Sequence, residues 1–564
     1  MLEFVHRSLK ERETQPSFKT SFLFVSTSEV AEAVLSYFDK VGEAGDEDYV
    51  QEMRHKISNL AEKYYKGLQE ELPDPVTSEI ERNLRLLRSI SSKNLMLIVT
   101  AHQPNLFPFS GVMRKIVLAN HLSKLVAKLK KAQGSNDFEV LCLFAVADHD
   151  FVHNKWIRSA ELPAPLRRDG VLRLNLQFRE KSDLMLPSNR IPKPSKELLE
   201  RWRSEIFEWI QENGSLATKY LRSIEPESKT DVSSQALQSF RDFWELVETA
   251  HNYSANLSEF SSFLLFLVSS KIWRIPMLFM NLSNFFPLLR REYLWFLENS
   301  EGFRSAILES EERLKACEVD SGLPNDLAEL SPLWLRCKCG SKYRLSFSER
   351  DLSGKCLRCQ SEIFLSLGEA RELIEHSPEL FEPRSISMPI SLSRATHMSC
   401  YIGGIGSLGY LIHARTASIA MRVSFPPTPF WFVPDRFIGV EQLAAMHEIK
   451  RIAQTYKLVS AETDLRHLES NAESLGSQLR AKIETGEEKK TPVTQRDQQL
   501  LQRISKISHA NPCMIGYAVD IGLDQLVAQW NKFLERVGNL HSEVPLESFC
   551  SLTLGTPVHS QLPL

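Results

Sequence analysis

The sequence predicts an α/β protein with a Rossmann-like parallel sheet, helical insertions, a small zinc ribbon and a C-terminal helical coiled-coil arm. Two apolar runs without polar alternation, 95–99 and 140–146, flank a helical pattern from about 111 to 131. This order indicates a strand–helix–strand unit whose strands are buried on both faces. Two cysteine pairs near 337 and 356 are typical of a zinc ribbon, and apolar steps of three and four residues from 437 to about 485 are typical of a coiled coil.

The bulk composition limits the class of protein. A chain of 564 residues is too long for one core and implies two to four domains. A formal net charge of -3, with 43% apolar and 25% charged residues, disfavours a general nucleic-acid or anionic-membrane binder. No secretory segment is visible, and the longest dense apolar run, 263–268, is far shorter than the roughly 20 residues of a membrane span. We therefore expect a cytoplasmic protein without membrane contact.

The chain divides into six predicted segments by changes in its pattern. An N-terminal helical region covers 1–90, and the Rossmann-like core with a helix-rich insertion covers 91–330, including a further strand near 276–280. The zinc ribbon covers 331–365, and the core is completed over 366–436. The coiled-coil arm covers 437–540, with shorter helical stretches near 494–508 and 519–538, and a tail follows at 541–564.

The four clustered cysteines form the strongest local signal, and they are Cys337, Cys339, Cys356 and Cys359. Two closely spaced pairs present four thiolates to one tetrahedral Zn²⁺. Four thiolates leave no open coordination position, so this zinc is expected to be structural. The first pair departs slightly from the usual two-residue spacing, and the alternative is four unrelated thiols in a reducing cell.

Polar side chains follow both strands of the strand–helix–strand unit. The first strand is followed by Thr100, His102, Gln103 and Asn105, and the second by Asp148, His149, Asp150 and Asn154. Because ligands in open α/β sheets bind at the carboxyl ends of strands, these side chains are candidate site residues. Turn and capping chemistry is the alternative explanation. A divalent metal at positions 148–150 is a further alternative, although neighbouring strand residues point to opposite faces.

A glycine-rich loop at 401–410 contains Gly403, Gly404 and Gly406 and precedes a helical pattern. Glycines let the backbone approach a phosphate or carboxylate closely. The acidic residue expected about 20 positions later in a dinucleotide site is missing, and the nearest candidate is Asp435. The loop is therefore interpreted as a ligand-approach loop rather than an NAD site, with a tight strand-to-helix turn as the alternative.

Three of these segments resemble one family. Residues 100–107 (TAHQPNLF) are similar to its T-G-Q-Q-x-G-L loop, 148–151 (DHDF) to its D-H-D-F segment, and 401–406 (YIGGIG) to its Y-[VI]-[AG]-G-P-G loop. The family is BshC, the cysteine ligases of bacillithiol biosynthesis, and the resemblance extends from about 90 to 540. The stretch HQPN is also similar to the start of WbqC-like proteins, in one motif only. Ala101, His102, Asn105, Ile405 and Ser407 depart from the BshC pattern, which affects the expected substrate more than the fold.

The resemblance implies a Rossmann-like core and a coiled-coil arm that forms a homodimer. It also implies a reaction that joins the cysteine carboxyl group to the amine of glucosaminyl-malate or a related amino-sugar conjugate. Forming an amide in water requires activation, so ATP is the expected cosubstrate, although no GxxxxGK[ST] motif is present. Any nucleotide would have to bind through strand-end loops and helix N-termini.

Roles for the candidate residues follow from their chemistry. Gln103 and Asn105 would orient a polar substrate, and His102 or His149 would transfer protons. The two aspartates beside His149 would bind an amine or orient the imidazole, and Arg394 would pair with a substrate carboxylate or form a surface ion pair.

Two other functions remain open from the sequence. The first is a catalytically degenerate binding or assembly protein that uses the ribbon and the arm for partner contacts. The second is RNA binding by the basic ribbon, whose charged residues are Lys338, Lys342, Arg344, Lys355 and Arg358. Such charge is usually only a solvated face.

Overall fold

The computed structural model describes residues 24–431 apart from gaps at 42–45, 92–93, 135–137, 165–166, 168–169, 225–231, 317–322, 325 and 348–350. It also describes scattered positions between 450 and 481 and the segment 513–540. Most of the predicted coiled-coil seam, the helix expected near 494–508 and the tail at 541–564 lie outside the described residues.

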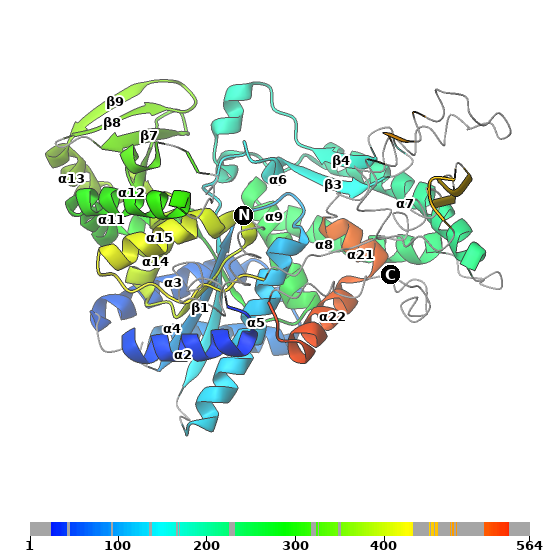
Figure 1. Ribbon diagram of the computed structural model, residues 1–564, viewed down its shortest axis with the longest axis horizontal. Helices are drawn as coiled ribbons and strands as arrows, with labels where there is room; N and C mark the ends of the chain where they lie inside the picture. The colour runs from blue at the N-terminus through cyan, green and yellow to red at the C-terminus, as the bar shows by residue number, and fades with distance from the viewer. Residues whose placement is uncertain are drawn as a thin grey trace.

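A parallel sheet of four strands forms the centre of the molecule (Figure 1). Its order is β11 (Cys400–Ile402), β1 (Leu95–His102), β2 (Glu139–Val146) and β5 (Leu278–Asn281). Every residue of β1 before His102 is buried, so both faces of this strand are covered. The continuous apolar runs therefore predicted two central parallel strands correctly.

Helices from both ends of the chain cover the sheet. The helix α5 (Ser110–Ala132) joins β1 to β2 and packs on both, as predicted, and α2 (Thr27–Val41) and α22 (Leu523–Arg536) pack against it. The helix α3 (Glu47–Lys66) packs on β5 and on α4 (Asp74–Ser89). The N-terminal helical region is thus a layer of the core rather than a separate unit.

The insertion between β2 and β5 is mainly helical, as predicted, and lies at one end of the molecule (Figure 1). It also contains an antiparallel hairpin that the sequence did not reveal. Its elements are α6 (Lys155–Arg158), β3 (Ser159–Pro163), β4 (Val171–Asn175), α7 (Lys196–Ile224), α8 (Val232–Tyr253) and α9 (Leu257–Leu267).

The ribbon lies at the opposite end of the molecule as a five-stranded antiparallel sheet of order β10-β6-β7-β8-β9. Its strands are β6 (Leu333–Arg336), β7 (Lys342–Phe347), β8 (Asp351–Cys356), β9 (Glu362–Ser366) and β10 (Phe381–Pro383). The predicted boundary at 365 is too early, because β10 returns to pair with β6 and places Pro383 opposite Leu333.

The remaining helices support the ribbon and the glycine-rich loop. Those described are α10 (Leu282–Phe285), α11 (Arg290–Glu298), α12 (Ser300–Ala316), α13 (Leu367–His376), α14 (Ser387–Thr396) and α15 (Leu408–Ala420). The helix after the glycine-rich loop was expected from the sequence, and it packs against α12 and α14.

The described end of the predicted arm belongs to the core. The helix α21 (Met514–Asp520) packs on α8, and α22 packs on α5. Trp530 of α22 is fully buried, and the indole N–H of Trp273 donates to the carbonyl oxygen of Leu523 at 2.9 Å. The arm predicted over 437–540 is therefore too long at its C-terminal end, because the amphipathic helix α22 buries its apolar face against α5 and neighbouring helices of the core.

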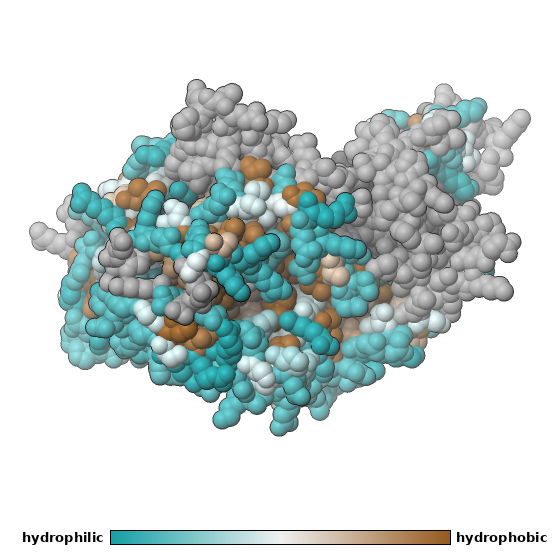
Figure 2. Space-filling model, turned by 90° about the horizontal axis from the view of Figure 1, so that it is seen from below, coloured by the Kyte–Doolittle hydropathy of each residue, from teal (hydrophilic) through white to brown (hydrophobic). Residues whose placement is uncertain are grey.

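Among the described helices, none combines the length and apolar character that crossing a membrane requires. The face of the molecule in Figure 2 is mostly hydrophilic where it is coloured, and its hydrophobic residues form small separate patches.

Candidate functional site

A cavity of about 850 Å³ lies at the carboxyl edge of the parallel sheet. The loops after β1, β2 and β11 line it together with the first turns of α5. Gln103, His149 and Gly404 therefore share one cavity, although more than 300 residues separate the first from the last. The lining includes these predicted residues: His102, Gln103, His149, Asp150, Asn154, Gly403, Gly404 and Gly406.

The loop after β1 presents two side chains to the cavity. The amide of Asn154 donates to the side-chain oxygen of Gln103 at 2.9 Å, which fixes the orientation of Gln103. The Nδ1 of His102 lies 2.8 Å from the carbonyl oxygen of Gln103. Because a carbonyl oxygen only accepts, Nδ1 carries the proton and Nε2 is left as an acceptor. Burial, with a smaller effect of Lys115, lowers the pKa of His102 to about 3, so the ring is neutral at pH 7.

Two predicted residues of the same loop lie outside the cavity lining. The hydroxyl of Thr100 donates to the carbonyl oxygen of Ile402 at 3.2 Å and links two strands of the sheet. Asn105 is 2% exposed, and no described residue hydrogen-bonds to its amide group. Neither residue can contact a ligand in the cavity in this conformation.

The loop after β2 separates its two aspartates. Asp148 faces away from the cavity and accepts hydrogen bonds from the backbone N–H and hydroxyl of Ser283 and from the amide of Asn189. The strand β2 ends at Val146, and the two aspartates lie in the turn that follows, where strand alternation no longer sets the side-chain direction. The predicted substrate contact of Asp148 is therefore wrong, and its carboxylate instead holds the loop against α10.

Asp150 and His149 line the cavity from the loop after β2. The Asp150 side chain is 43% exposed inside the cavity, and its Oδ1 lies 3.6 Å from Nε2 of His149. Burial raises the pKa of Asp150 to about 6, although the charge of Lys342 opposes this. Burial also lowers the pKa of His149 to about 3, and its Nδ1 is buried without a hydrogen-bond partner in the described structure. The pair therefore offers a carboxylate and a neutral imidazole at pH 7.

Packing accounts for two glycines of the glycine-rich loop, Gly403 and Gly404. A Cβ on Gly403 would lie 2.4 Å from the ring of Phe430, and one on Gly404 would lie 3.0 Å from Cε of Lys115. The backbone N–H of Gly403 donates to the carbonyl oxygen of Pro429, and that of Gly404 donates to the hydroxyl of Ser407. The expectation that these two N–H groups bind an anion is therefore wrong, because both already have acceptors.

Lys115 is a site residue that sequence analysis missed. It is 6% exposed, it lines the cavity from α5, and its Nζ donates to the carbonyl oxygen of Ala101 at 2.9 Å. Burial lowers its pKa to about 7. A signal was present, because Lys115 lies on the helix stripe of Val112 and Ala119, both buried.

The ribbon sheet supplies a whole wall of the cavity, which the sequence did not indicate. Lys342 of β7 is 2% exposed and donates to the carbonyl oxygen of His149 at 2.7 Å. Its Nζ also lies 2.6 Å from a carboxylate oxygen of Glu382, whose other oxygen accepts from Arg336 at 2.5 Å. Trp334, Lys342 and Arg384 line the cavity, so the ribbon is part of the site rather than a separate module.

Arg394 does not line the cavity. Its guanidinium carbon lies 4.0 Å from the centre of the Trp295 ring, within a cluster that includes Glu292. The predicted pairing with a substrate carboxylate in this cavity is wrong, because α14 directs Arg394 toward α11.

The basic residues of the ribbon are mostly paired with acids. Arg344 lies 2.5 Å from Asp326, Arg358 lies 2.8 Å from Asp183, and Lys355 lies 3.9 Å from Glu362. Lys342 is buried beside Glu382, so four of the five basic residues named above lie beside carboxylates in the described part of the ribbon, which weakens the case for a phosphate-backbone site.

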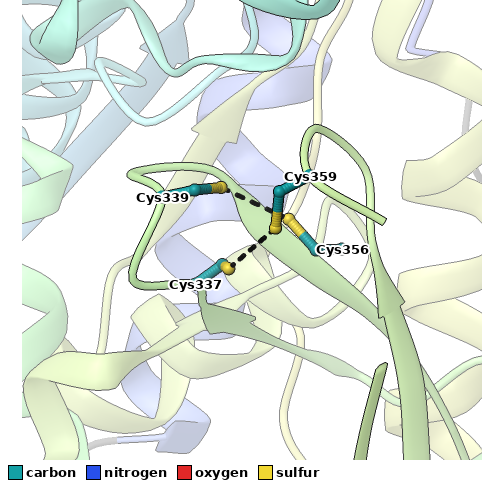
Figure 3. A group of neighbouring side chains, drawn as sticks. All are labelled: Cys337, Cys339, Cys356 and Cys359. Carbon is teal, nitrogen blue, oxygen red and sulfur yellow. Dashed lines mark hydrogen bonds between the residues drawn. The ribbon is translucent and has the colours of Figure 1, made fainter. Parts of the chain in front are cut away.

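The four cysteines meet at one end of the ribbon sheet (Figure 3). The Sγ atoms of Cys337 and Cys359 lie 3.6 Å apart, and those of Cys339 and Cys356 lie 3.5 Å apart. Four sulfurs at about 2.3 Å from a tetrahedral ion lie about 3.8 Å from one another, whereas a disulfide requires about 2.05 Å. The cluster therefore has the geometry to hold a metal ion such as zinc.

Two tight turns bring the thiols together. The first turn reverses the chain at Gly340, whose φ of +89° favours glycine. The N–H of Gly340 donates to the carbonyl oxygen of Cys337. The second returns at Gln360, with a φ of +62°, and its N–H donates to the carbonyl oxygen of Cys356. Among the described residues, these cysteines are the one set of three or more potential metal ligands, so a metal at 148–150 lacks support.

The fold and the site define an α/β protein with a ribbon whose four cysteines could hold a metal ion and a cationic cavity of the size that small ligands occupy. No protein-family model matches the chain, and no curated protein matches it.

Proposed function

We propose that this protein is a carbon–nitrogen ligase that joins the carboxyl group of cysteine to the amine of glucosaminyl-malate or a related amino-sugar conjugate. The observation that carries the proposal is that the loops with the BshC-like motifs, which are far apart in the chain, line one cavity. The proposal rests on the resemblance of those motifs and on the chemistry of the cavity, since no matched relative supports it.

The charge of the cavity supports an anionic substrate. Arg114, Lys115, Lys342 and Arg384 line it, whereas Asp150 is the one carboxylate side chain in its described lining. Glu382 lies behind the wall and neutralises part of this charge. Cysteine, malate and ATP all carry carboxylate or phosphate groups that this surplus would stabilise.

The aromatic side chains of the cavity support a ligand with a ring. The rings of Phe109 and Trp156 lie 5.1 Å apart, and the Arg114 guanidinium lies 5.7 Å from the centre of the Trp431 ring. All four side chains line the cavity. Aromatic and apolar surfaces beside a few polar groups are typical of sites for sugars and nucleobases.

The proposed reaction balances with ATP as cosubstrate. A carboxylate oxygen of cysteine displaces ADP from the γ-phosphorus and forms an acyl phosphate. The amine of the conjugate then attacks the acyl carbon, phosphate leaves and the amide forms. The amine must lose a proton before it attacks, and Asp150, whose pKa burial raises to about 6, accepts that proton at neutral pH. The neutral His149 ring lies beside this carboxylate, with its Nε2 3.6 Å from Oδ1 of Asp150.

The metal at the ribbon is proposed to be zinc with a structural role. Four thiolates would occupy every position of a tetrahedral ion, so no position remains for a substrate. The homodimer implied by the resemblance involves the arm, most of which lies outside the described residues, and stays a prediction.

The direct test is an assay for the amide product by mass spectrometry, with ATP, cysteine and glucosaminyl-malate. Asp150→Asn is expected to lower the rate at least a hundredfold, the usual effect of losing a general base, without changing the fold. Asp326→Asn, which removes a surface carboxylate paired with Arg344, is the matched control and should keep its activity. Full activity of Asp150→Asn would contradict the role of Asp150.

A binding or assembly protein is the second candidate, and one observation favours it. The strand β9 is an edge of the ribbon sheet, and its Phe364 is 68% exposed. Exposed edges and apolar side chains are common features of partner contacts. A real substrate stabilises the folded protein by RT ln(1+[L]/Kd), so the absence of any melting shift with all three substrates would favour this candidate over the ligase.

A further inference from the structure

The ribbon wall of the cavity has a cationic corner, formed by Trp334, Lys342 and Arg384. These side chains come from β6, the start of β7 and the turn after β10. They belong to none of the segments that resemble the ligase family. They line the same cavity as the loops at the sheet edge, so a ligand that fills this cavity would contact both.

Arg384 is held by stacking and not by an acid. Its guanidinium carbon lies 4.1 Å from the centre of the Trp334 ring. Its Nη1 is buried, and no described residue accepts a hydrogen bond from it. Asp326 contributes only a minor electrostatic effect and is already bound by both oxygens to Arg344, at 2.5 and 2.6 Å. Burial lowers the pKa of Arg384 to about 10, so the group is charged at neutral pH.

Lys342 contributes a second cation with a donor to spare. Its Nζ has three hydrogens, donates one to the carbonyl oxygen of His149 and lies 2.6 Å from a carboxylate oxygen of Glu382. The same Nζ lies 4.9 Å from the centre of the Phe151 ring. Glu382 is shared with Arg336, so one carboxylate serves two cations and the corner keeps a surplus of positive charge.

We propose that Arg384 and Lys342 form a carboxylate-binding subsite, which takes the dicarboxylate end of the substrate. The stacked guanidinium has a fixed plane, and its edge offers parallel N–H donors that match the two oxygens of a planar carboxylate. The same fork can also bind two oxygens of a phosphate, so inorganic phosphate is the competing anion in the test. The assignment of the dicarboxylate to the acceptor conjugate rests on the proposed ligase function, whereas the subsite itself rests on the corner.

The subsite is tested by calorimetric titration of the full-length protein with malate and, separately, with inorganic phosphate. Arg384→Met keeps an apolar side chain over Trp334 and removes the charge, and it should weaken malate binding at least tenfold. Lys355→Gln, which removes another ribbon cation that lies outside the cavity lining and pairs with exposed Glu362, is the matched control and should bind malate as the wild type does. If Arg384→Met folds poorly, Arg384→Lys keeps the charge without the planar fork and should still weaken malate binding severalfold.

Three results would overturn the proposal. They are unchanged malate affinity in the Arg384 variants, no malate binding to the wild type at millimolar concentration, and equal loss of malate and phosphate binding, which would mean an anion site without preference for carboxylates. The product assay separates this proposal from the ligase function. If Arg384→Met loses malate binding but the wild type forms no amide product, the subsite proposal stands and the ligase proposal is rejected. If the wild type forms the amide and Arg384→Met has an unchanged KM for the conjugate, the ligase proposal stands and the subsite proposal is rejected.

Discussion

Replacing Glu382 by glutamine tests whether buried ion pairs hold the ribbon wall in place. Glu382 is 2% exposed, and its carboxylate lies 2.5 Å from Nε of Arg336 and 2.6 Å from Nζ of Lys342. The substitution keeps the size of the side chain and removes its charge, so the ammonium group of Lys342 stays buried without a carboxylate. Removing one partner of a buried pair usually lowers the free energy of unfolding by about 3–5 kcal/mol.

The pKa of Glu382 leads to a second estimate of the same effect. Burial raises this pKa, but the charges of Lys342 and Arg336, joined by His149 once that ring is protonated at low pH, outweigh burial and lower it from 4.5 to about 2. At about 1.36 kcal/mol for each pH unit, this difference corresponds to roughly 3 kcal/mol. Because the folded pKa is the lower one, the stabilisation is complete above pH 4.5 and is lost as the pH falls toward 2. Both estimates therefore agree on about 3 kcal/mol at neutral pH.

The assay is urea denaturation at pH 7, followed by tryptophan fluorescence. Glu362→Gln is the matched control, because Glu362 is 79% exposed, lies 3.9 Å from Lys355, and should change stability by less than about 0.5 kcal/mol. The double variant Lys342→Met/Glu382→Gln should recover part of the loss, since no unpaired ammonium remains buried. A Glu382→Gln protein within about 1 kcal/mol of the wild type, or a difference that does not shrink between pH 4.5 and 3, would refute the reasoning.

Three further predictions concern the glycine-rich loop, Lys115 and the metal. Gly403→Ala should cost about 1–3 kcal/mol, because its Cβ would lie 2.4 Å from Phe430, whereas Gly406→Ala, with open space around it, should leave the melting temperature unchanged. Burial lowers the pKa of Lys115 to about 7, so between pH 7 and 10 the unfolded chain binds more protons than the folded one and the free energy of unfolding rises with pH. Denaturation curves at several pH values should show the wild type gaining about 1.4 kcal/mol per pH unit relative to Lys115→Met. Equal pH dependence of stability in the two proteins would contradict the burial of a charged Lys115. Protein purified without chelator should carry one zinc per chain by mass spectrometry, and full zinc in Cys356→Ser would exclude the four-thiolate site.

The central strands could be predicted because their environment dictates their composition. A parallel strand buried on both faces needs an unbroken apolar run, and β1 and β2 have one. The strand β11 has only three residues and pairs with β1 across about 300 positions, so no local pattern marks it. The cysteine pairs were equally readable, because a metal cluster needs two tight turns whose spacing appears in the sequence.

The candidate site was predictable only where it depends on the sheet. The rule for strand ends located Gln103, His149 and Asp150, which line the cavity. That rule could not decide which of two neighbouring aspartates faces the ligand. Lys342 and Arg384 could not be found, because their positions depend on how the ribbon docks against the sheet. A lysine in an antiparallel strand normally faces solvent, and no neighbouring residue in the sequence indicates otherwise.

The pairing of β11 with β1 has a consequence for synthesis of the chain. Thr100 lies beside Ile402, so one edge of β1 has no partner until about 300 further residues have been translated. At about 5–20 residues per second, this interval lasts roughly 15–60 s. An apolar strand with an open edge is prone to pair with other chains during that time. During synthesis, the open edge of β1 is therefore covered only when β11 has been made and has paired with it. We expect chaperone supply to change the yield of folded protein but not the stability of the protein once it is folded.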